Sequence, residues 1–326
     1  MIRWGFYGIG TIANKLANDF KAVSNGMIVA AYGRNDDMVK AFCEVHGIEK
    51  AYSDEDAFFD DKSIDIIYIA VPHSLHMAVA MKAINHGKAV LCEKPFALNY
   101  NTALPIINEA KANKIFIMEG LWSLFLPAQI ELKKAILGGK IGDLQSFECS
   151  FGFKSDADET HRLMNRALGG GALLDVGVYN LLMCWHLFGE LPRIDSVETI
   201  LTETGVDGTH IIKGDISSQN IEIKLSASIL ENFDNKMRVI GTKGSCEAQN
   251  FWETKVYTLN DQLYMVNNNE GVFLWGYQYE IEHVNQCLLD GLKESEIATH
   301  QLTLLLSKKM DEIREKIGMV YDVDLK

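Results

Sequence analysis

The first 120 residues alternate short apolar runs with amphipathic stretches, and this alternation limits the possible folds more than any other feature. The apolar runs are too short for helices and have the length of buried strands. They cover residues 2–7, 27–32, 64–71, 89–92 and 115–118. The stretches between them, with helical spacing, cover residues 12–23, 38–46, 77–86 and 101–114. Strands and helices in strict succession predict a doubly wound parallel α/β sheet, as in a Rossmann domain.

After residue 120 the pattern changes to two helices followed by β-rich runs. The helices are predicted at 128–137 and 173–188, and two more at 278–290 and 299–317. The β-rich runs cover 197–203, 210–216, 221–228, 236–240, 245–248 and 255–259. Turn residues separate these runs, which predicts an antiparallel or mostly antiparallel mixed sheet in an α+β domain. We expect a dinucleotide-binding domain at 1–120 and a substrate-binding domain at 121–326.

Composition narrows the classes of function. The chain has 326 residues, 48% of them hydrophobic and 23% charged, with a net charge of −13. This charge argues against nucleic acid or an anionic membrane as a partner. Six cysteines without a CxxC pair indicate neither a disulfide framework nor a zinc site. Because the first strand begins at Ile2 and no apolar run approaches about 20 residues, we expect a soluble cytoplasmic protein.

A glycine-rich turn follows the first apolar run directly and opens the first helix. It reads Gly8-Ile9-Gly10-Thr11-Ile12-Ala13, a G-x-G-x-x-A pattern in the strand-to-helix setting that makes such a match credible. Gly8 permits the tight turn, and Gly10 lets the backbone approach a pyrophosphate. The helix N-terminus that starts at Thr11 and Ile12 supplies free N–H groups to the phosphates. The alternative is a glycine turn that serves topology alone.

The end of the second strand distinguishes the two nicotinamide cofactors. An acidic residue there accepts hydrogen bonds from the ribose of NAD, whereas arginine accommodates the 2′-phosphate of NADP. Arg34 occupies this place, and the first acid after it is Asp36. NADP is therefore favoured, with NAD as the alternative. The alternative for Arg34 itself is a surface arginine that has no role in cofactor binding.

Glu93-Lys94-Pro95 closes the apolar run at 89–92. The carboxyl ends of parallel strands are where open α/β sheets hold ligands. Pro95 ends the strand and restricts the backbone of Lys94. A lysine so placed is a candidate for catalysis and cofactor contact, although a solvated lysine is the simpler reading of the tripeptide alone.

A second dense motif runs from Gly169 to Tyr179 and contains Asp175. Asp175 and Tyr179 are four residues apart at a predicted helix start, so they face one side and converge on one small ligand. A tyrosine beside an ammonium such as Lys94 acts as general acid or base in hydride transfer to a carbonyl. The structural alternatives are a helix-terminal charge for Asp175 and a half-buried core tyrosine for Tyr179.

Four further residues follow strand ends in the first domain. Pro72, His73 and His76 follow the run at 64–71, and Trp122 follows the run at 115–118. The two histidines have the spacing of a metal pair, but no further ligand is spaced to complete a site, so no metal is predicted. Contact with cofactor or substrate is the preferred reading for all four. For Trp122, a buried tryptophan between domains is an equal alternative.

These motifs together resemble the Gfo/Idh/MocA oxidoreductase family over nearly the full length. Many members of the family have histidine where this chain has Tyr179. With tyrosine at this position, the chain is similar to the branch of dimeric dihydrodiol dehydrogenases and NADP-dependent D-xylose dehydrogenases. The residues that carry the resemblance are Gly8–Ala13, Val71-Pro72 with His76, Glu93-Lys94-Pro95, Gly169–Tyr179, Gly241-Thr242-Lys243-Gly244 and Met118-Glu119-Gly120-Leu121-Trp122. The resemblance departs at Phe147-Glu148-Cys149, where the mammalian dihydrodiol enzymes are expected to have an arginine.

The resemblance implies oxidation of trans-dihydrodiols or aldopyranoses with NADP. It also implies Lys94 and Tyr179 as the catalytic pair beside Asp175, Arg34 at the 2′-phosphate, and a homodimer formed through an open face of the second sheet. The expected function is hydride transfer between nicotinamide and a sugar, cyclic polyol or dihydrodiol. The alternatives are a reductase of another small carbonyl, such as an anhydro-ketose, and a non-catalytic cofactor-sensing regulator.

Overall fold

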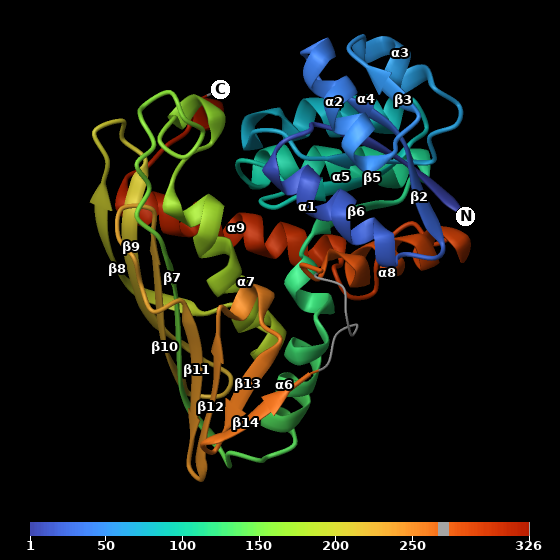
Figure 1. Ribbon diagram of the computed structural model, residues 1–326. Helices are drawn as coiled ribbons and strands as arrows, with labels where there is room; N and C mark the ends of the chain where they lie inside the picture. Colours follow the sequence, from blue (N-terminus) through green and yellow to red (C-terminus); the bar gives the residue numbers. More distant parts are fainter. Residues whose placement is uncertain (267–273, 326) are drawn as a thin grey trace. The chain divides into compact units, whose positions relative to one another are not determined.

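The computed structural model describes residues 1–266 and 274–325, and within these the chain forms two compact units (Figure 1). The first comprises Met1–Trp122 and Gly271–Leu304, and the second Ser123–Glu270 and Leu305–Lys326. The expected division at residue 120 lies close to the first crossing. It differs at 271–304, where the chain returns to the first unit. Each unit is described by itself below.

The first unit is built on a six-stranded sheet whose pairings are all parallel, as the alternation predicted. Its order is β3-β2-β1-β4-β5-β6. The strands are β1 (Ile2–Tyr7), β2 (Gly26–Tyr32), β3 (Lys50–Tyr52), β4 (Ile66–Ile69), β5 (Ala89–Glu93) and β6 (Ile117–Gly120). The order reverses direction between β1 and β4, which is the topological switch point where such sheets bind ligands.

Capping residues account for the ends of several helices in the first unit. They are α1 (Thr11–Asp19), α2 (Asp36–His46), α3 (Glu55–Asp60), α4 (His76–Asn85), α5 (Tyr100–Asn113) and α8 (Tyr277–Leu289). Asn99 and Thr102 form a capping box at the start of α5, and the helix continues through Pro105. Gly47 ends α2 in the left-handed conformation.

The return of α8 to the first unit depends on one carboxylate. Asp19 is fully buried at the end of α1 and accepts hydrogen bonds from three successive backbone N–H groups, those of Trp275 (3.0 Å), Gly276 (2.8 Å) and Tyr277 (2.9 Å). A carboxylate on the free N–H groups of a helix start is a strong, charge-assisted arrangement. It fixes α8 against the helix that follows the glycine turn.

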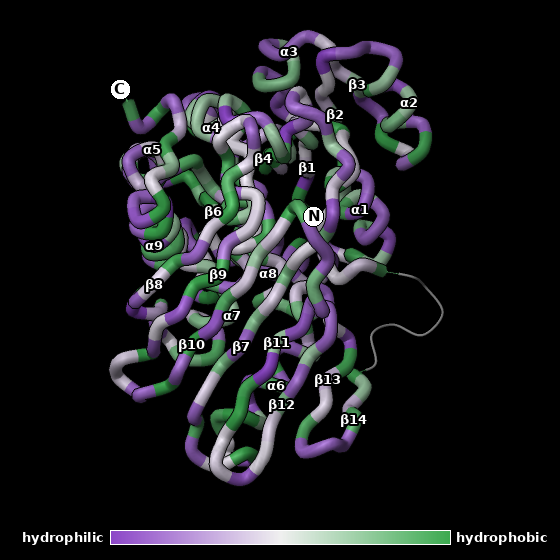
Figure 2. Tube along the Cα trace, turned by 90° about the vertical axis from the view of Figure 1, so that its left-hand side faces the viewer, coloured by the Kyte–Doolittle hydropathy of each residue, from purple (hydrophilic) through white to green (hydrophobic). Residues whose placement is uncertain are grey.

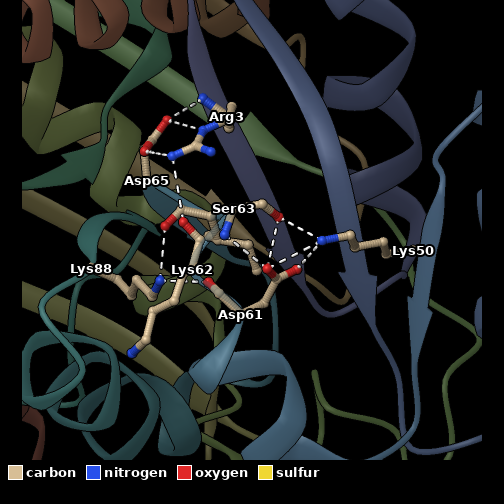
Figure 3. Close-up of polar contacts among 8 residues, drawn as sticks. Arg3, Lys50, Asp61, Lys62, Ser63, Asp65 and Lys88 are labelled. Atoms are coloured by element: carbon tan, nitrogen blue, oxygen red, sulfur yellow. Dashed lines mark hydrogen bonds and ion pairs between the residues drawn. The ribbon is translucent and has the colours of Figure 1, made fainter.

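A cluster of charged residues at the amino ends of the parallel strands is structural (Figure 3). Arg3 pairs with Asp65 at 2.6 Å, and Lys50 pairs with Asp61 at 3.0 Å. The buried Lys88 ammonium donates to the carbonyl oxygen of Asp61 (2.6 Å) and to that of the residue before Asp65 (2.9 Å). The side chains of Arg3, Lys50 and Lys88 thus all have partners that connect the starts of neighbouring strands. The candidate site lies at the opposite edge, where the strands end.

The second unit is built on an eight-stranded mixed sheet, in agreement with the prediction. Its order is β14-β13-β12-β11-β7-β10-β9-β8, and the β7–β10 pair is parallel while the others are antiparallel. The strands are β7 (Leu144–Gly152), β8 (Arg193–Leu201), β9 (Asp207–Ile216), β10 (Ile221–Ser228), β11 (Lys236–Gly241), β12 (Gly244–Gln249), β13 (Val256–Leu259) and β14 (Gln262–Met265). Neither β7 nor β14 was among the predicted β-rich runs.

Helices α6 (Pro127–Leu137) and α7 (Val178–Phe188) pack on one face of this sheet, and α9 (His300–Ile317) runs from the first unit into the second. Hydrophilic and hydrophobic residues alternate along several strands of this sheet (Figure 2), as expected where one face is buried and the other is not. Residues 166–188 are long and apolar enough to cross a membrane, yet 89% of the most apolar window is buried inside the protein, as in the core helix of a globular domain.

We predict that Asp19→Ala lowers the free energy of unfolding by about 2 kcal/mol, because three buried N–H groups lose their charged acceptor. Urea denaturation followed by circular dichroism measures the change. Asp37→Ala, which removes an exposed acid from the first turn of α2, is the matched control. An equal, small effect of both substitutions contradicts the role assigned to Asp19.

Candidate active site

The glycine turn lies between β1 and α1, where the sequence placed it. Gly8 has φ of +104°, and a Cβ there would come within 2.3 Å of the Ala70 carbonyl oxygen, so only glycine fits. At Gly10 a Cβ would meet no atom within 4 Å, which leaves open space over this peptide. Gly10 is the N-cap of α1 and has no side chain to cap the helix. The N–H groups of Thr11 and Ile12 therefore fit an anionic group such as a pyrophosphate.

Arg34 and the helix after it complete this end of the sheet. Arg34 is exposed and follows the end of β2, and its contact with a ribose phosphate stays a prediction. Asp36, the nearest acid, forms an ion pair with Lys40 at 2.6 Å on the first turn of α2. The charge of Asp36 is therefore compensated by Lys40 on the same helix turn.

Glu93 and Lys94 occupy the carboxyl end of β5. Glu93 is buried and accepts a hydrogen bond of 2.6 Å from the hydroxyl of Tyr68, a fully buried side chain on β4. The Glu93 carboxylate and burial together raise the pKa of that phenol well above its usual value. Lys94 is half-buried, and the Lys94–Pro95 peptide bond is cis. The ladder ends before Pro95, as predicted.

The two histidines after Pro72 do different things. His76 is fully buried, with Nδ1 2.9 Å from the carbonyl oxygen of Pro95 and Nε2 2.9 Å from that of Val71. Burial lowers its pKa. His76 thus connects the loop after β4 to the loop after β5, while His73 precedes it in a short 3-10 turn. A contact of either ring with a cofactor stays a prediction.

Trp122 and Glu119 flank the end of β6. The Trp122 ring stacks on Tyr277 of α8, with centroids 4.4 Å apart and only 3% of the tryptophan exposed. Glu119 accepts a hydrogen bond of 2.9 Å from the backbone N–H of Phe96. Burial raises the pKa of Glu119 to about 7, against the lowering effect of hydrogen bonds from Thr303 and Phe96. The sequence identified Trp122 but assigned no role to Glu119.

In the second unit, the motif that ends at Tyr179 does not form one continuous α-helix. Leu173–Gly177 is a π-helix, and α7 begins only at Val178. The sequence predicted a single helix from Leu173, and that prediction was wrong in this first turn and a half. Single π turns inside helices recur at functional sites. Asp175 lies in this π turn and Tyr179 in the first turn of α7, and the convergence of the two side chains on one ligand stays a prediction.

A buried polar pair holds the π turn. Asp207 at the start of β9 accepts hydrogen bonds from the Leu173 N–H (2.7 Å) and lies 3.0 Å from Nδ1 of His210. The His210 ring in turn packs against Gly177, where a Cβ would come within 2.9 Å of it. Only glycine permits this approach. Nothing in the local sequence pattern around Asp207 indicated this role, because the contact joins segments 34 residues apart.

Asp175 itself is buried and forms an ion pair of 2.8 Å with Arg162. Arg162 belongs to the loop between β7 and the π turn, and 43% of its side chain is exposed. Sequence reasoning did not identify this arginine. It supplies Asp175 with a cation from within its own unit.

Tyr179 is 7% exposed and lies against an aromatic pair. Phe151 of β7 stacks on Trp252 with centroids 3.6 Å apart and an interplanar angle of 8°. The Tyr179 ring lies 5.8 Å from that of Phe151. Sequence reasoning missed both aromatic residues: Phe151 lies on β7, which was not predicted, and Trp252 lies in a short 3-10 turn between β12 and β13. They give Tyr179 an apolar wall.

A parallel sheet with an open glycine turn at its switch point, and ionisable side chains at the ends of β5 and β6, defines a dinucleotide-dependent oxidoreductase of the Rossmann class. Residues 2–121 match the family model described as "Oxidoreductase family, NAD-binding Rossmann fold", and residues 130–247 match the GFO/IDH/MocA C-terminal domain. The chain belongs to the Gfo/Idh/MocA oxidoreductase family, and its enzymes are dehydrogenases and reductases that act on CH–OH groups.

Relatives of known name agree with this membership over the whole length. The trans-1,2-dihydrobenzene-1,2-diol dehydrogenase of Xenopus laevis is 33% identical over 333 residues, covering 98% of this chain and 99% of the relative. The human enzyme of the same name is 32% identical over 340 residues, covering 99% of each.

Solved structures share the fold at lower identity. The aldose-aldose oxidoreductase from Caulobacter crescentus, complexed with glycerol, has a TM-score of 0.85 at 23% identity over 97% of both chains. KijD10, a 3-ketoreductase from Actinomadura kijaniata in complex with NADP and TDP-benzene, has a TM-score of 0.87 at 21% identity over 97% of both.

Proposed function

We propose that this protein is an NADP-dependent dehydrogenase that transfers a hydride between nicotinamide and a sugar, cyclic polyol or trans-dihydrodiol, with Lys94 and Tyr179 as its acid/base pair. The observation that carries the proposal is the position of Tyr179, a proton-transfer group set against the Phe151–Trp252 stack. An apolar wall beside an acid/base group suits a ring that has hydroxyls on its edge and C–H groups on its face.

The residues divide the chemistry between them. When bound, the cofactor supplies or accepts the hydride. Tyr179 takes up the hydroxyl proton when an alcohol is oxidised and returns it in reduction, and the Lys94 ammonium stabilises its phenolate. Asp175, oriented by Arg162, accepts a hydrogen bond from a substrate hydroxyl. The dihydrodiol and aldose activities named for relatives and structural neighbours support this substrate class.

The cofactor contacts follow from the carboxyl edge of the first sheet. Gly8, Gly10, Thr11 and Ile12 hold the pyrophosphate, and Arg34 binds the 2′-phosphate of NADP. Crystals of KijD10 with NADP support this choice over NAD. The nicotinamide end contacts a further set of residues, namely Pro72, His73, His76, Glu93, Lys94 and Trp122.

Reduction of another small carbonyl, such as an anhydro-ketose, uses the same groups in the opposite direction. A non-catalytic cofactor sensor has no need of Lys94, Asp175 and Tyr179 together, so this alternative is less well supported. The six cysteines are all free and buried, which supports a reducing, cytoplasmic location.

We also propose that two copies pair through the uncovered face of the second sheet. Arg238 of β11 lies on this face, in register with Glu148 of β7 on one side and Glu247 of β12 on the other. Its guanidinium pairs with Glu247 at 2.8 Å. A face of alternating charges and small polar groups is typical of an interface that gains specificity from charge complementarity.

Tyr179→Phe is expected to reduce turnover at least 1,000-fold while NADPH binding is retained, because the ring remains and the transferable proton is lost. Steady-state absorbance at the reduced-nicotinamide band measures turnover with aldoses, inositols and dihydrodiols. Tyr257→Phe removes the hydroxyl of another buried tyrosine of the same unit and serves as control. Normal turnover in Tyr179→Phe refutes the assignment.

Arg34→Ala is expected to weaken NADPH binding about 10- to 100-fold and NADH binding little, because only NADPH has the 2′-phosphate. Fluorescence titration of both cofactors gives the two dissociation constants. Lys40→Ala removes a nearby exposed cation that pairs with Asp36 and is the control. Equal losses for the two cofactors contradict the role of Arg34.

Arg238→Glu is expected to convert the dimer to a monomer, since it places three carboxylates in one row across β7, β11 and β12. Light scattering coupled to gel filtration measures the mass. Lys243→Glu makes the same charge change at an exposed hairpin position. A dimer that survives Arg238→Glu unchanged argues for a different interface.

A further inference from the structure

Three consecutive glycines, Gly169–Gly171, precede the π turn, and the mechanism above gives them no role. Gly170 lies so close to the loop before it that a Cβ would come within 2.7 Å of the Arg162 carbonyl oxygen and 2.5 Å of the Leu163 carbonyl oxygen. The N–H of Gly171 donates to the same Leu163 oxygen at 2.9 Å. The glycines therefore attach the backbone of the loop at Arg162 to the start of the π turn, and a side chain at Gly170 does not fit.

A tyrosine from a distant part of the sequence contacts this glycine segment. Tyr321 follows α9 and is 1% exposed, and its hydroxyl donates a hydrogen bond of 2.6 Å to the carbonyl oxygen of Gly170. Burial raises the pKa of Tyr321 well above its usual value, so the hydroxyl remains a donor at physiological pH. A buried tyrosine hydroxyl normally has a partner, and this partner is a backbone group of the glycine segment.

The position of Tyr321 is itself fixed by an arginine. Arg314 of α9 has a side chain that is 4% exposed, and its guanidinium carbon lies 4.8 Å from the centre of the Tyr321 ring. Arg314 pairs with Asp311 at 2.6 Å and also with Asp324, whose carboxylate accepts a hydrogen bond of 2.7 Å from the Tyr321 N–H. A planar guanidinium suits both contacts, because it stacks on an aromatic ring and pairs with carboxylates. Tyr321 is therefore held on α9 by its backbone and by its ring.

This support reaches the acid of the candidate site through two contacts. The Gly170 backbone packs on the carbonyl of Arg162, and the Arg162 guanidinium pairs with Asp175 at 2.8 Å. An arginine side chain loses considerable rotamer entropy when it is fixed. Since 43% of the Arg162 side chain is exposed, the ion pair with Asp175 depends on a well-placed Arg162 backbone.

We propose that Tyr321 is a positioning residue for substrate binding: its hydroxyl holds Gly170 and, through the backbone at Arg162, keeps Arg162 paired with Asp175. The inference rests on the proposed function, in which Asp175 accepts a hydrogen bond from a substrate hydroxyl. Because Tyr321 is buried, it acts through these residues and not by touching the substrate. Its loss weakens substrate binding and leaves proton transfer at Tyr179 in place.

Tyr321→Phe is expected to raise KM for the substrate about 5- to 10-fold, while kcat and the dissociation constant of NADPH change less than about 2-fold, because the ring stays and one buried hydrogen bond is lost. Steady-state kinetics at saturating NADP, with the best substrate among aldoses, inositols and dihydrodiols, gives KM and kcat. Tyr257→Phe removes another buried hydroxyl of the same unit and should leave both constants unchanged. An unchanged KM in Tyr321→Phe overturns the proposal, as does a fall in kcat alone.

A double-substitution cycle with Arg162→Gln distinguishes positioning from a general loss of stability. If Tyr321 acts through Arg162, Tyr321→Phe raises KM in the unsubstituted protein but adds no further increase in Arg162→Gln. The same increase in both backgrounds overturns the proposed route from Tyr321 to Asp175.

Hydrogen exchange followed by mass spectrometry tests the coupling without turnover. We expect peptides that cover residues 162–171 to exchange about 5-fold faster in Tyr321→Phe, and peptides of β10 to exchange as before. Faster exchange at 162–171 in a protein that turns over no member of the substrate panel refutes the proposed function and still supports the coupling of Tyr321 to the Arg162 loop. Unchanged exchange at 162–171 overturns the inference, even where Tyr179→Phe confirms the proposed function.

Discussion

The hydrogen bonds from the start of α8 to Asp19 are the constraint on which the first unit depends. They attach a segment from residue 274 onward to the helix that follows the glycine turn. Trp4 and Asn285 add a second attachment, a 2.8 Å hydrogen bond between β1 and the far part of α8. Because α8 is attached at its start and at Asn285, the Tyr277 ring is held against Trp122, with centroids 4.4 Å apart. The Asp19 carboxylate thereby positions an aromatic part of the candidate site.

Local patterns were sufficient to predict the first sheet and the places of several candidate residues along it. Three features depend only on residues close together in sequence: the alternation of runs, the turn from Gly8 and the strand end at Glu93. They can therefore be predicted without a structure. The parallel sheet and the positions of Arg34, Lys94 and Trp122 on its elements follow from them. Helix α8 was predicted within one residue of its bounds, but its return to the first unit was not, because the contact that attaches it joins Trp275 to Asp19, more than 250 positions earlier.

The second unit shows the same limit. The prediction omitted β7, whose sequence alternates as Leu144-Gln145-Ser146-Phe147 and contains too few β-branched residues to stand out. Its parallel partner β10 and the resulting register bring Phe151 beside Tyr179. The π turn was equally invisible, because Asp207 and His210 impose it from β9. A sequence with helical spacing thus forms a π turn because of contacts with residues distant in sequence, which local patterns do not show.

The two units treat their buried acids differently. In the second unit, the buried carboxylate of Asp175 has a partner of opposite charge, Arg162, at 2.8 Å. In the first unit, Glu119 and Glu280 are buried on β6 and α8, and burial is the main cause that raises the pKa of each. The second unit thus compensates its buried acid with a cation, whereas in the first unit burial shifts the acids toward their protonated form, which removes the cost of a buried charge without a partner.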